Sequence, residues 1–122
     1  MSGSKNRAPA ITINGREFCI NVGRDVIRAL DHPSHICILE HDNWQMIAIA
    51  PCDENDVLAF QVPEGFPEDR SRKFRIYSQS LVNEIITQCA LDPGTTHNLK
   101  GDYVESMNAV LFCVAASDMP EE

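Results

Sequence analysis

Alternating apolar and polar residues predict two β-hairpins in the first half of the chain. Residues 11–20, ITINGREFCI, form two short β-prone runs around Asn14 and Gly15. Asn-Gly is the dipeptide that best tolerates the positive φ angles of a tight hairpin turn, so we expect the chain to reverse there. Residues 35–50 contain two further strand-like runs, HICILEH and WQMIAIA, and we expect them to reverse at residues 42–43.

Apolar residues at helical spacing predict two short helices. Residues 22–30 place their apolar side chains on one side of a helix, which Pro33 prevents from running further. Residues 78–91 predict the second helix, and Ser78 or Ser80 is available to cap its first turn. We expect one face of that helix to be buried, formed by Leu81, Val82, Ile85, Ile86, Cys89 and Ala90.

The order of strand, helix and hairpin occurs twice along the chain. The strand KFRIYS, residues 73–78, precedes the second helix, and residues 96–116 predict two more strands that reverse near 105–108. When residues 18–30 are aligned with the residues 56 positions later, five apolar positions match, whereas about two matches are expected by chance. We therefore interpret the chain as a tandem duplication. The matches are Phe18 with Phe74, Ile20 with Ile76, Val26 with Val82, Ala29 with Ile85, and Leu30 with Ile86.

These elements predict a single small α+β domain made of two strand-helix-hairpin repeats. A chain of 122 residues buries roughly two-thirds of its unfolded surface, which is enough for one stable core. The joining segment is rich in proline and charge around one apolar run, VLAFQV, so we interpret it as a linker that contains one strand. The predicted boundaries are 1–10 for a disordered tail, 11–117 for the domain, 11–53 and 73–117 for its repeats, 54–72 for the linker, and 118–122 for an acidic tail.

Composition favours a globular protein of the cytoplasm. Apolar residues make up 43% of the chain and charged residues 23%. No apolar run approaches the roughly 18 residues of a membrane span, and the amino terminus lacks the apolar core of a secretory signal, so we expect no membrane partner. Five cysteines are an odd number without a C-x-x-C pair, and we interpret Cys19, Cys37 and Cys113 as reduced core residues.

The chain is strongly acidic, but one short segment is basic. A net charge of −8 opposes sequence-independent binding of nucleic acid, which depends on lysines and arginines that release counterions from phosphates. Residues 70–75, RSRKFR, nevertheless hold four of the ten basic residues. We interpret them as a strip that binds a partner's phosphates or carboxylates; the alternative is that Glu64, Glu68 and Asp69 neutralise them locally. The candidate contact residues are Arg70, Arg72, Lys73 and Arg75.

Trp44 and the histidines are further candidate residues. Trp44 lies beside a reversal, where it acts either as an anchor for a partner or as a half-buried strand residue. His32 and His35 lie near Cys37 and Cys52 in the sequence, but the paired ligand spacing of zinc sites is missing, so we expect no metal and no cofactor. No catalytic motif accompanies the four histidines, and we expect no enzyme activity.

The segment CDENDV, residues 52–57, begins like a calcium-binding loop. The glycine and the terminal glutamate that such a loop requires are absent at their offsets. We therefore interpret this segment as a solvated turn.

The element order and several residues resemble the swapped-hairpin fold of the AbrB and MazE family. The resemblance covers residues 11–53 and, in outline, 73–115. The chain also resembles small uncharacterised proteins of bacteria and mobile elements that carry an ALGNP and IAIRP signature, here ALDHP and IAIAP. The residues that match the family pattern are Gly15, Arg16, Phe18 and Ile20, then Arg28 and Leu30, then Asp42, Ile47 and Ile49.

The resemblance implies a dimer that binds DNA through basic residues around the first strand of each unit. Those positions correspond to Arg16 in the first unit and to the 70–75 cluster in the second. Two features depart from the family: the spacing from Gly15 to the helix is longer, and the net charge is −8.

We expect a non-enzymatic regulatory or inhibitory protein that acts by binding a macromolecular partner, encoded on a phage or another mobile element. The partner expected first is a protein. One alternative is an AbrB-like DNA-binding transcription regulator or antitoxin, and another is a protein that sequesters a small anionic ligand such as a nucleotide. We also expect a homodimer, because the sheet edges at VLAFQV and at the first hairpin need covering.

Overall fold

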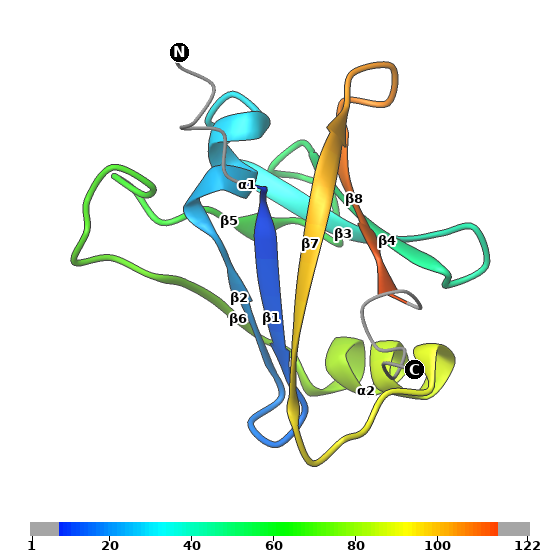
Figure 1. Ribbon diagram of the computed structural model, residues 1–122. Helices are drawn as coiled ribbons and strands as arrows, with labels where there is room; N and C mark the ends of the chain where they lie inside the picture. The colour runs from blue at the N-terminus through cyan, green and yellow to red at the C-terminus, as the bar shows by residue number, and fades with distance from the viewer. Residues whose placement is uncertain (1–7, 115–122) are drawn as a thin grey trace.

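The computed structural model describes residues 8–114, which form eight strands and two short helices (Figure 1). The predicted acidic tail and the first seven residues of the predicted amino-terminal tail lie outside the described residues. The strands are β1 (Ala10–Asn14), β2 (Cys19–Val22), β3 (His35–His41), β4 (Met46–Pro51), β5 (Phe60–Gln61), β6 (Phe74–Tyr77), β7 (Thr96–Val104) and β8 (Ala109–Cys113), and the helices are α1 (Arg24–Ala29) and α2 (Gln79–Cys89).

All eight strands join one antiparallel sheet in the order β5-β3-β4-β8-β7-β1-β2-β6. The sheet curls into a nearly closed barrel whose seam lies between β5 and β6, the two strands at the ends of this order (Figure 1). The predicted α+β class with two packed strand-helix-hairpin repeats is therefore wrong. The two helices contain only 6 and 11 residues, and the strands of both halves pair into one sheet instead of forming two units that pack together.

Hairpins from the first half of the chain lie next to strands from the second half around the barrel. β2 pairs with β6, where Ile20 lies opposite Ile76, and β4 pairs with β8, where Ala48 lies opposite Leu111. β1 pairs with β2 on one side and with β7 on the other. Ile20 and Ile76 are also one of the matched pairs of the sequence comparison, but the tandem duplication itself stays a prediction.

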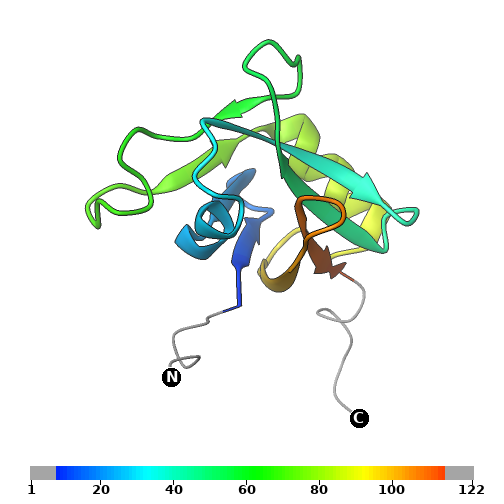
Figure 2. The same ribbon diagram turned by 90° about the horizontal axis from the view of Figure 1, so that it is seen from above.

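The core fills the inside of the barrel, and the helices close its two ends (Figures 1 and 2). Alternate residues of the strands point inward, in keeping with the two-residue period of a β-strand. The predicted burial of Val82, Ile85 and Ile86 is confirmed, and Ser78 caps α2 by accepting a hydrogen bond from the Leu81 N–H at 3.3 Å. Ala90 was placed on the buried face wrongly, because it is exposed and ends the helix in a left-handed conformation.

The first predicted hairpin is confirmed, but its turn differs from the predicted Asn-Gly turn. The turn spans residues 15–18, and the positive φ of 55° belongs to Phe18. The Asn14 side chain instead accepts hydrogen bonds from the backbone N–H groups of Arg16 at 3.0 Å and Glu17 at 3.1 Å. Gly15 is needed for space, since a Cβ there would lie 2.6 Å from the Pro93 carbonyl oxygen.

The remaining predictions of local structure hold in part. The second hairpin is confirmed, with positive φ angles at Asp42, Asn43 and Trp44 in its turn. The VLAFQV run contributes only Phe60 and Gln61 to a strand.

Neither helix among residues 8–114 has the length and apolar character that crossing a membrane requires.

None of the five cysteines, which all lie in the described part of the chain, takes part in a disulfide. Cys19 and Cys37 are buried, as expected of reduced core residues, whereas Cys113 is partly exposed. Burial, followed by the neighbouring Cys52, raises the pKa of the Cys37 thiol to about 12.

Candidate functional site: a polar face beside an anchored arginine loop

Four neighbouring strands, β6, β2, β1 and β7, turn polar side chains outward. Their inward residues are buried, from Phe74 and Ile76 on β6 to Leu99 on β7. The outward residues form rows across the four strands, and in one row Arg75, Asn21, Thr12 and Asn98 are successive partners. We call the exposed or half-buried outward positions the polar face: Lys73, Arg75, Tyr77, Asn21, Ala10, Thr12, Asn14, Thr96, Asn98, Lys100 and Asp102.

The polar face carries three cations and one carboxylate, Asp102, which lies at its margin two residues after Lys100 on β7. Lys73, Arg75 and Lys100 are all exposed. Between them, the Thr12 hydroxyl donates a hydrogen bond to the Asn98 side-chain oxygen at 2.6 Å. A side-chain hydrogen bond with Tyr77 raises the pKa of the Arg75 guanidinium, so its positive charge is held on this face.

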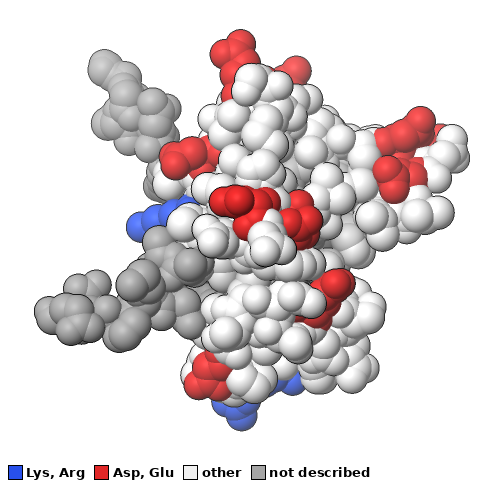
Figure 3. Space-filling model, turned by 90° about the vertical axis from the view of Figure 1, so that its right-hand side faces the viewer, with Lys and Arg blue, Asp and Glu red and all other residues white. Residues whose placement is uncertain are grey.

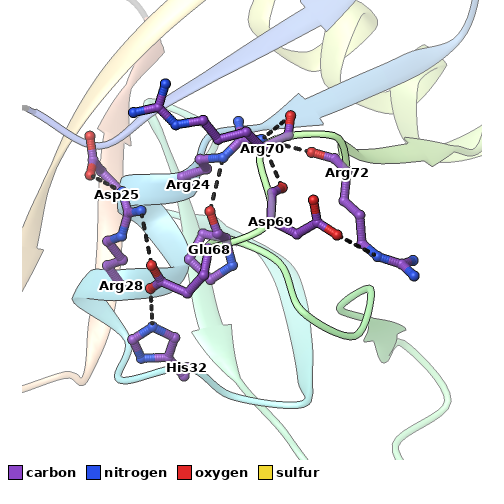
Figure 4. A network of polar contacts seen from close by, with 9 residues as sticks. Arg24, Asp25, Arg28, His32, Glu68, Asp69, Arg70 and Arg72 are labelled. Atoms are coloured by element: carbon purple, nitrogen blue, oxygen red, sulfur yellow. Dashed lines mark hydrogen bonds and ion pairs between the residues drawn. The ribbon is translucent and has the colours of Figure 1, made fainter.

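The segment from residue 63 to residue 73 runs beside this face and is held by Arg24, the first residue of α1 (Figure 4). The Arg24 guanidinium lies 5.2 Å from the centre of the Phe66 ring, a cation-π contact. Its nitrogens donate to backbone carbonyls along the segment. Arg24 Nε donates to Pro67 at 2.9 Å, and Nη2 lies 2.8 Å from the oxygen of Arg72, 3.0 Å from that of Arg70 and 3.2 Å from that of Asp69.

A second group of contacts joins α1 to the same segment through Glu68 (Figure 4). Glu68 lies 3.2 Å from His32 Nε2 and 3.6 Å from Arg28 Nη2, and Arg28 also contacts Asp25 at 3.2 Å. Hydrogen bonds from His32 and then from Arg28 hold the pKa of the Glu68 carboxyl below its ordinary value. These groups are exposed, so they contribute to the position of the segment more than to stability.

The predicted basic strip divides into two parts. Lys73 and Arg75 belong to the polar face, as the alternation along RKFRIY predicts. Arg70 and Arg72 are exposed on the anchored segment, and Arg72 forms an ion pair with Asp69 at 3.5 Å.

Arg16 and Trp44, the other two predicted contact residues, lie away from this segment. Arg16 is exposed in the turn between β1 and β2, at the Cys19 end of β2, whereas the anchored segment meets the sheet at the Val22 end. Trp44 lies in the turn between β3 and β4, is half-buried and packs against the core. Its carbonyl accepts a hydrogen bond from the Cys89 thiol at 3.3 Å. The role of both residues in binding stays a prediction.

The molecule is electrically asymmetric. Of the eight Lys and Arg residues in the described part of the chain, six lie on α1 or in residues 70–75, with four acidic residues beside them. The rest of the described chain has two basic and eleven acidic residues. Figure 3 shows one acidic side, where Asp and Glu are spread across the surface and Lys and Arg lie only at its margins.

Sequence reasoning did not find Arg24, Asn21, Thr12 or Asn98. Arg24 carries no signal in the sequence, because its partners are backbone carbonyls 43 to 48 residues away. The polar row depends on which strands become neighbours, and this is set by the fold. The chain matches no protein-family model, no curated protein and no solved structure.

Proposed function

We propose that this chain is a non-enzymatic regulatory binding protein that holds an acidic surface of a protein partner against its polar face. The observation that carries the proposal is that the polar face has three cations against one carboxylate in a chain of net charge −8. Binding an anionic surface there relieves the repulsion among Lys73, Arg75 and the nearby arginines of the anchored segment.

The chemistry of the polar face suits carboxylates presented by a folded surface. Arg75 offers a planar fork that pairs with a carboxylate through two hydrogen bonds. Asn21 and Asn98 offer both donors and acceptors between the cations. These residues lie on paired strands, so little conformational entropy is lost when the partner binds.

A protein partner fits the charge distribution better than nucleic acid does. DNA carries a phosphate charge about every 1.7 Å of its axis, and so it also meets the acidic remainder of this molecule over a long distance. A protein surface with a few carboxylates contacts the polar face alone. The bound protein would then regulate or inhibit its partner by covering the partner's acidic surface.

Binding of DNA, as in an AbrB-like regulator or antitoxin, is the second candidate. It is favoured by the position of Arg70 and Arg72 on the segment beside Lys73 and Arg75. If these four residues and Lys100 all contacted phosphates, log K would fall with log salt at a slope of roughly −4 to −5.

A small anionic ligand is the least favoured alternative. The depression lined by Asn21, Arg24, Phe66, Lys73 and Arg75 has a volume of about 220 Å³. A larger hollow of about 640 Å³, lined by Arg24, Arg28, Pro67, Glu68 and Arg70, is shallow, and the Glu68 carboxylate already pairs with Arg28 there. Pockets for ligands of nucleotide size generally have roughly 300 to 1,000 Å³ and enclose most of the ligand.

Binding of two fluorescently labelled polyanions, poly-glutamate and random-sequence duplex DNA, tests the proposal. The test variant is Lys73→Ser with Arg75→Ser and Lys100→Ser. The matched control is Asn83→Asp with Thr87→Glu and Gln88→Glu, which adds the same negative charge on the exposed side of α2. We expect the parent and the control to bind poly-glutamate with a shallow salt dependence, and the test variant to bind at least tenfold more weakly.

Two results contradict this proposal. Equal losses in the test and control variants would show that only net charge matters. A steep salt slope with DNA, together with no binding of poly-glutamate, would replace the protein partner by DNA.

We also propose that the protein works in the cytoplasm as a homodimer. Five cysteines without a disulfide are typical of a reducing compartment. The ends of the sheet at β5 and β6 are not joined to each other, so each has an edge that a second copy can cover. Light scattering is expected to give twice the monomer mass of 13.6 kDa, and a monomer mass at micromolar concentration would contradict the dimer.

A further inference from the structure

Three side chains with metal-binding atoms meet beside the β3–β4 pair, away from the polar face. Cys37 lies in β3, Cys52 directly follows β4, and Asp56 lies in the loop that leads to β5. The two Sγ atoms and a carboxylate oxygen all lie within 4.8 Å of one another. The proposed function does not use any of these groups.

The fold positions the three donors through backbone contacts. Cys37 lies opposite Ala50 on β4. Cys52 extends this pairing, because its N–H donates to the His35 carbonyl at 3.1 Å. A tight turn then brings Asp56 back, with its N–H 2.9 Å from the Asp53 carbonyl oxygen.

Burial and charge both favour a cation at this point. Cys37 is buried, Cys52 is half-buried and Asp56 is exposed, so an ion can enter from the Asp56 side and be shielded at the Cys37 side. Residues 29–69 contain nine acidic side chains and no Lys or Arg. The potential around the three donors is therefore negative, with no basic neighbour in this segment to compete for the carboxylate.

We propose that Cys37, Cys52 and Asp56 form a binding site for a zinc ion. Two thiolates and one carboxylate are ligands that zinc accepts, at about 2.3 Å from sulfur and about 2.0 to 2.2 Å from oxygen. Tetrahedral geometry then requires ligand atoms roughly 3.4 to 3.8 Å apart, which the present separations approach with small side-chain movements. Three protein ligands leave a fourth position for water.

Zinc at this site ties the loop before β5 to the barrel wall. That loop carries two exposed apolar side chains, Val57 at 95% and Leu58 at 55% exposure. The Asp53 and Asp56 carboxylates accept local hydrogen bonds from the backbone N–H groups of Asn55 and Leu58. The Asp56 carboxylate also contacts the Cys37 thiol, and zinc would strengthen this link to β3. The ligand spacing, with fourteen residues between the cysteines, has no short paired motif, which explains why the sequence did not indicate zinc.

Titration of the reduced full-length protein with Co²⁺ tests the site, since cobalt takes the same ligands and is visible spectroscopically. We expect one cobalt per chain, a thiolate-to-cobalt charge-transfer band in the near ultraviolet, and loss of that band when Zn²⁺ is added. Cys52→Ser should lower the Co²⁺ affinity at least tenfold, and Asp56→Asn should lower it without removing the band. Cys113→Ser, which changes another partly exposed cysteine, is the matched control and should behave like the parent.

Thermal melting with and without Zn²⁺ gives a second readout. Zinc should raise the Tm of the parent and of Cys113→Ser but not of Cys52→Ser, because only a folded site binds the ion. Absence of the band in the reduced parent, or an equal band in Cys52→Ser, would overturn the proposal. Recovery of a Cys37–Cys52 disulfide together with no cobalt band would overturn it as well, and would assign the pair to thiol oxidation.

Discussion

Asn21 lies directly opposite Arg75 in the β2–β6 ladder, and its partner on the other side is Thr12. This row joins the amide, the guanidinium and the hydroxyl into one outward surface, although the residues are far apart in the sequence. The polar face therefore exists only because β6, from the second half of the chain, pairs with β2 from the first half.

Replacing Arg24 by Ala is predicted to release the segment from residue 63 to residue 73. Arg24 donates to four backbone carbonyls of this segment, and hydrogen bonds from a charged group contribute about 1.5 to 3 kcal/mol. We expect trypsin to cleave after Arg70 and Arg72 about tenfold faster in the variant, as followed by mass spectrometry.

Arg28→Ala is the control for this experiment, because Arg28 contacts the segment only through the exposed Glu68 carboxylate. It should leave the cleavage rate near that of the parent. Arg24→Lys should not restore protection, since an ammonium lacks the planar fork. Cleavage of Arg24→Ala at the parental rate would show that other contacts hold the segment.

Ile20→Ala and Ile76→Ala are predicted to destabilise the protein by about 2 to 5 kcal/mol each. Both side chains are buried, and the residues face one another across the β2–β6 pair. Because the two side chains share one environment, the double variant should lose less than the sum of the single losses, with a coupling of about 0.5 to 3 kcal/mol.

Urea unfolding of the single and double variants measures these losses. Leu39→Ala, at a position 41% exposed, is the matched control and should cost much less. Additive losses for Ile20 and Ile76 would contradict direct packing across this pair.

The Glu68 carboxyl is predicted to titrate below the ordinary range of glutamate, because His32 and then Arg28 donate to it. The folded pKa lies below the unfolded pKa, so this cluster stabilises the fold at pH values above the unfolded pKa. The contribution is lost as the pH falls through the lowered value.

A carboxyl-carbon NMR titration measures the pKa of Glu68 directly. In His32→Ala we expect that pKa to rise towards its ordinary value. An unchanged Glu68 titration in this variant would rule out His32 as the main cause of the shift.

Local structure was largely predictable from the sequence. Helical spacing identified Val82, Ile85 and Ile86 as core residues, and alternation predicted both hairpins. These features depend on residues close together in the chain, so their periodicity is visible without knowledge of the fold.

The barrel was not predictable in the same way. Its order depends on which strands pair at long range, and no local pattern specifies that β7 lies next to β1. The prediction of packed repeats treated each half of the chain as a separate unit. In the structure, β2 pairs with β6 and β4 pairs with β8, so strands of the first half pair with strands of the second half.

The candidate site was predictable only in its charges. The density of basic residues indicated Arg70, Arg72, Lys73 and Arg75, and alternation placed Lys73 and Arg75 outward. Neither signal indicated Asn21 and Asn98, which lie on the same surface as Lys73 and Arg75. Their strands become neighbours only through long-range pairing in the fold.

Amide NMR during titration with poly-glutamate tests the central claim, that the polar face binds an acidic surface, most directly. We predict that the largest shifts fall on Lys73, Arg75 and Lys100 and on the side-chain amides of Asn21 and Asn98. The α2 control variant should show the same pattern, and Lys73→Ser with Arg75→Ser and Lys100→Ser should show almost none. Shifts centred on Trp44 or α2, or equal shifts in the polar-face variant, would contradict this account.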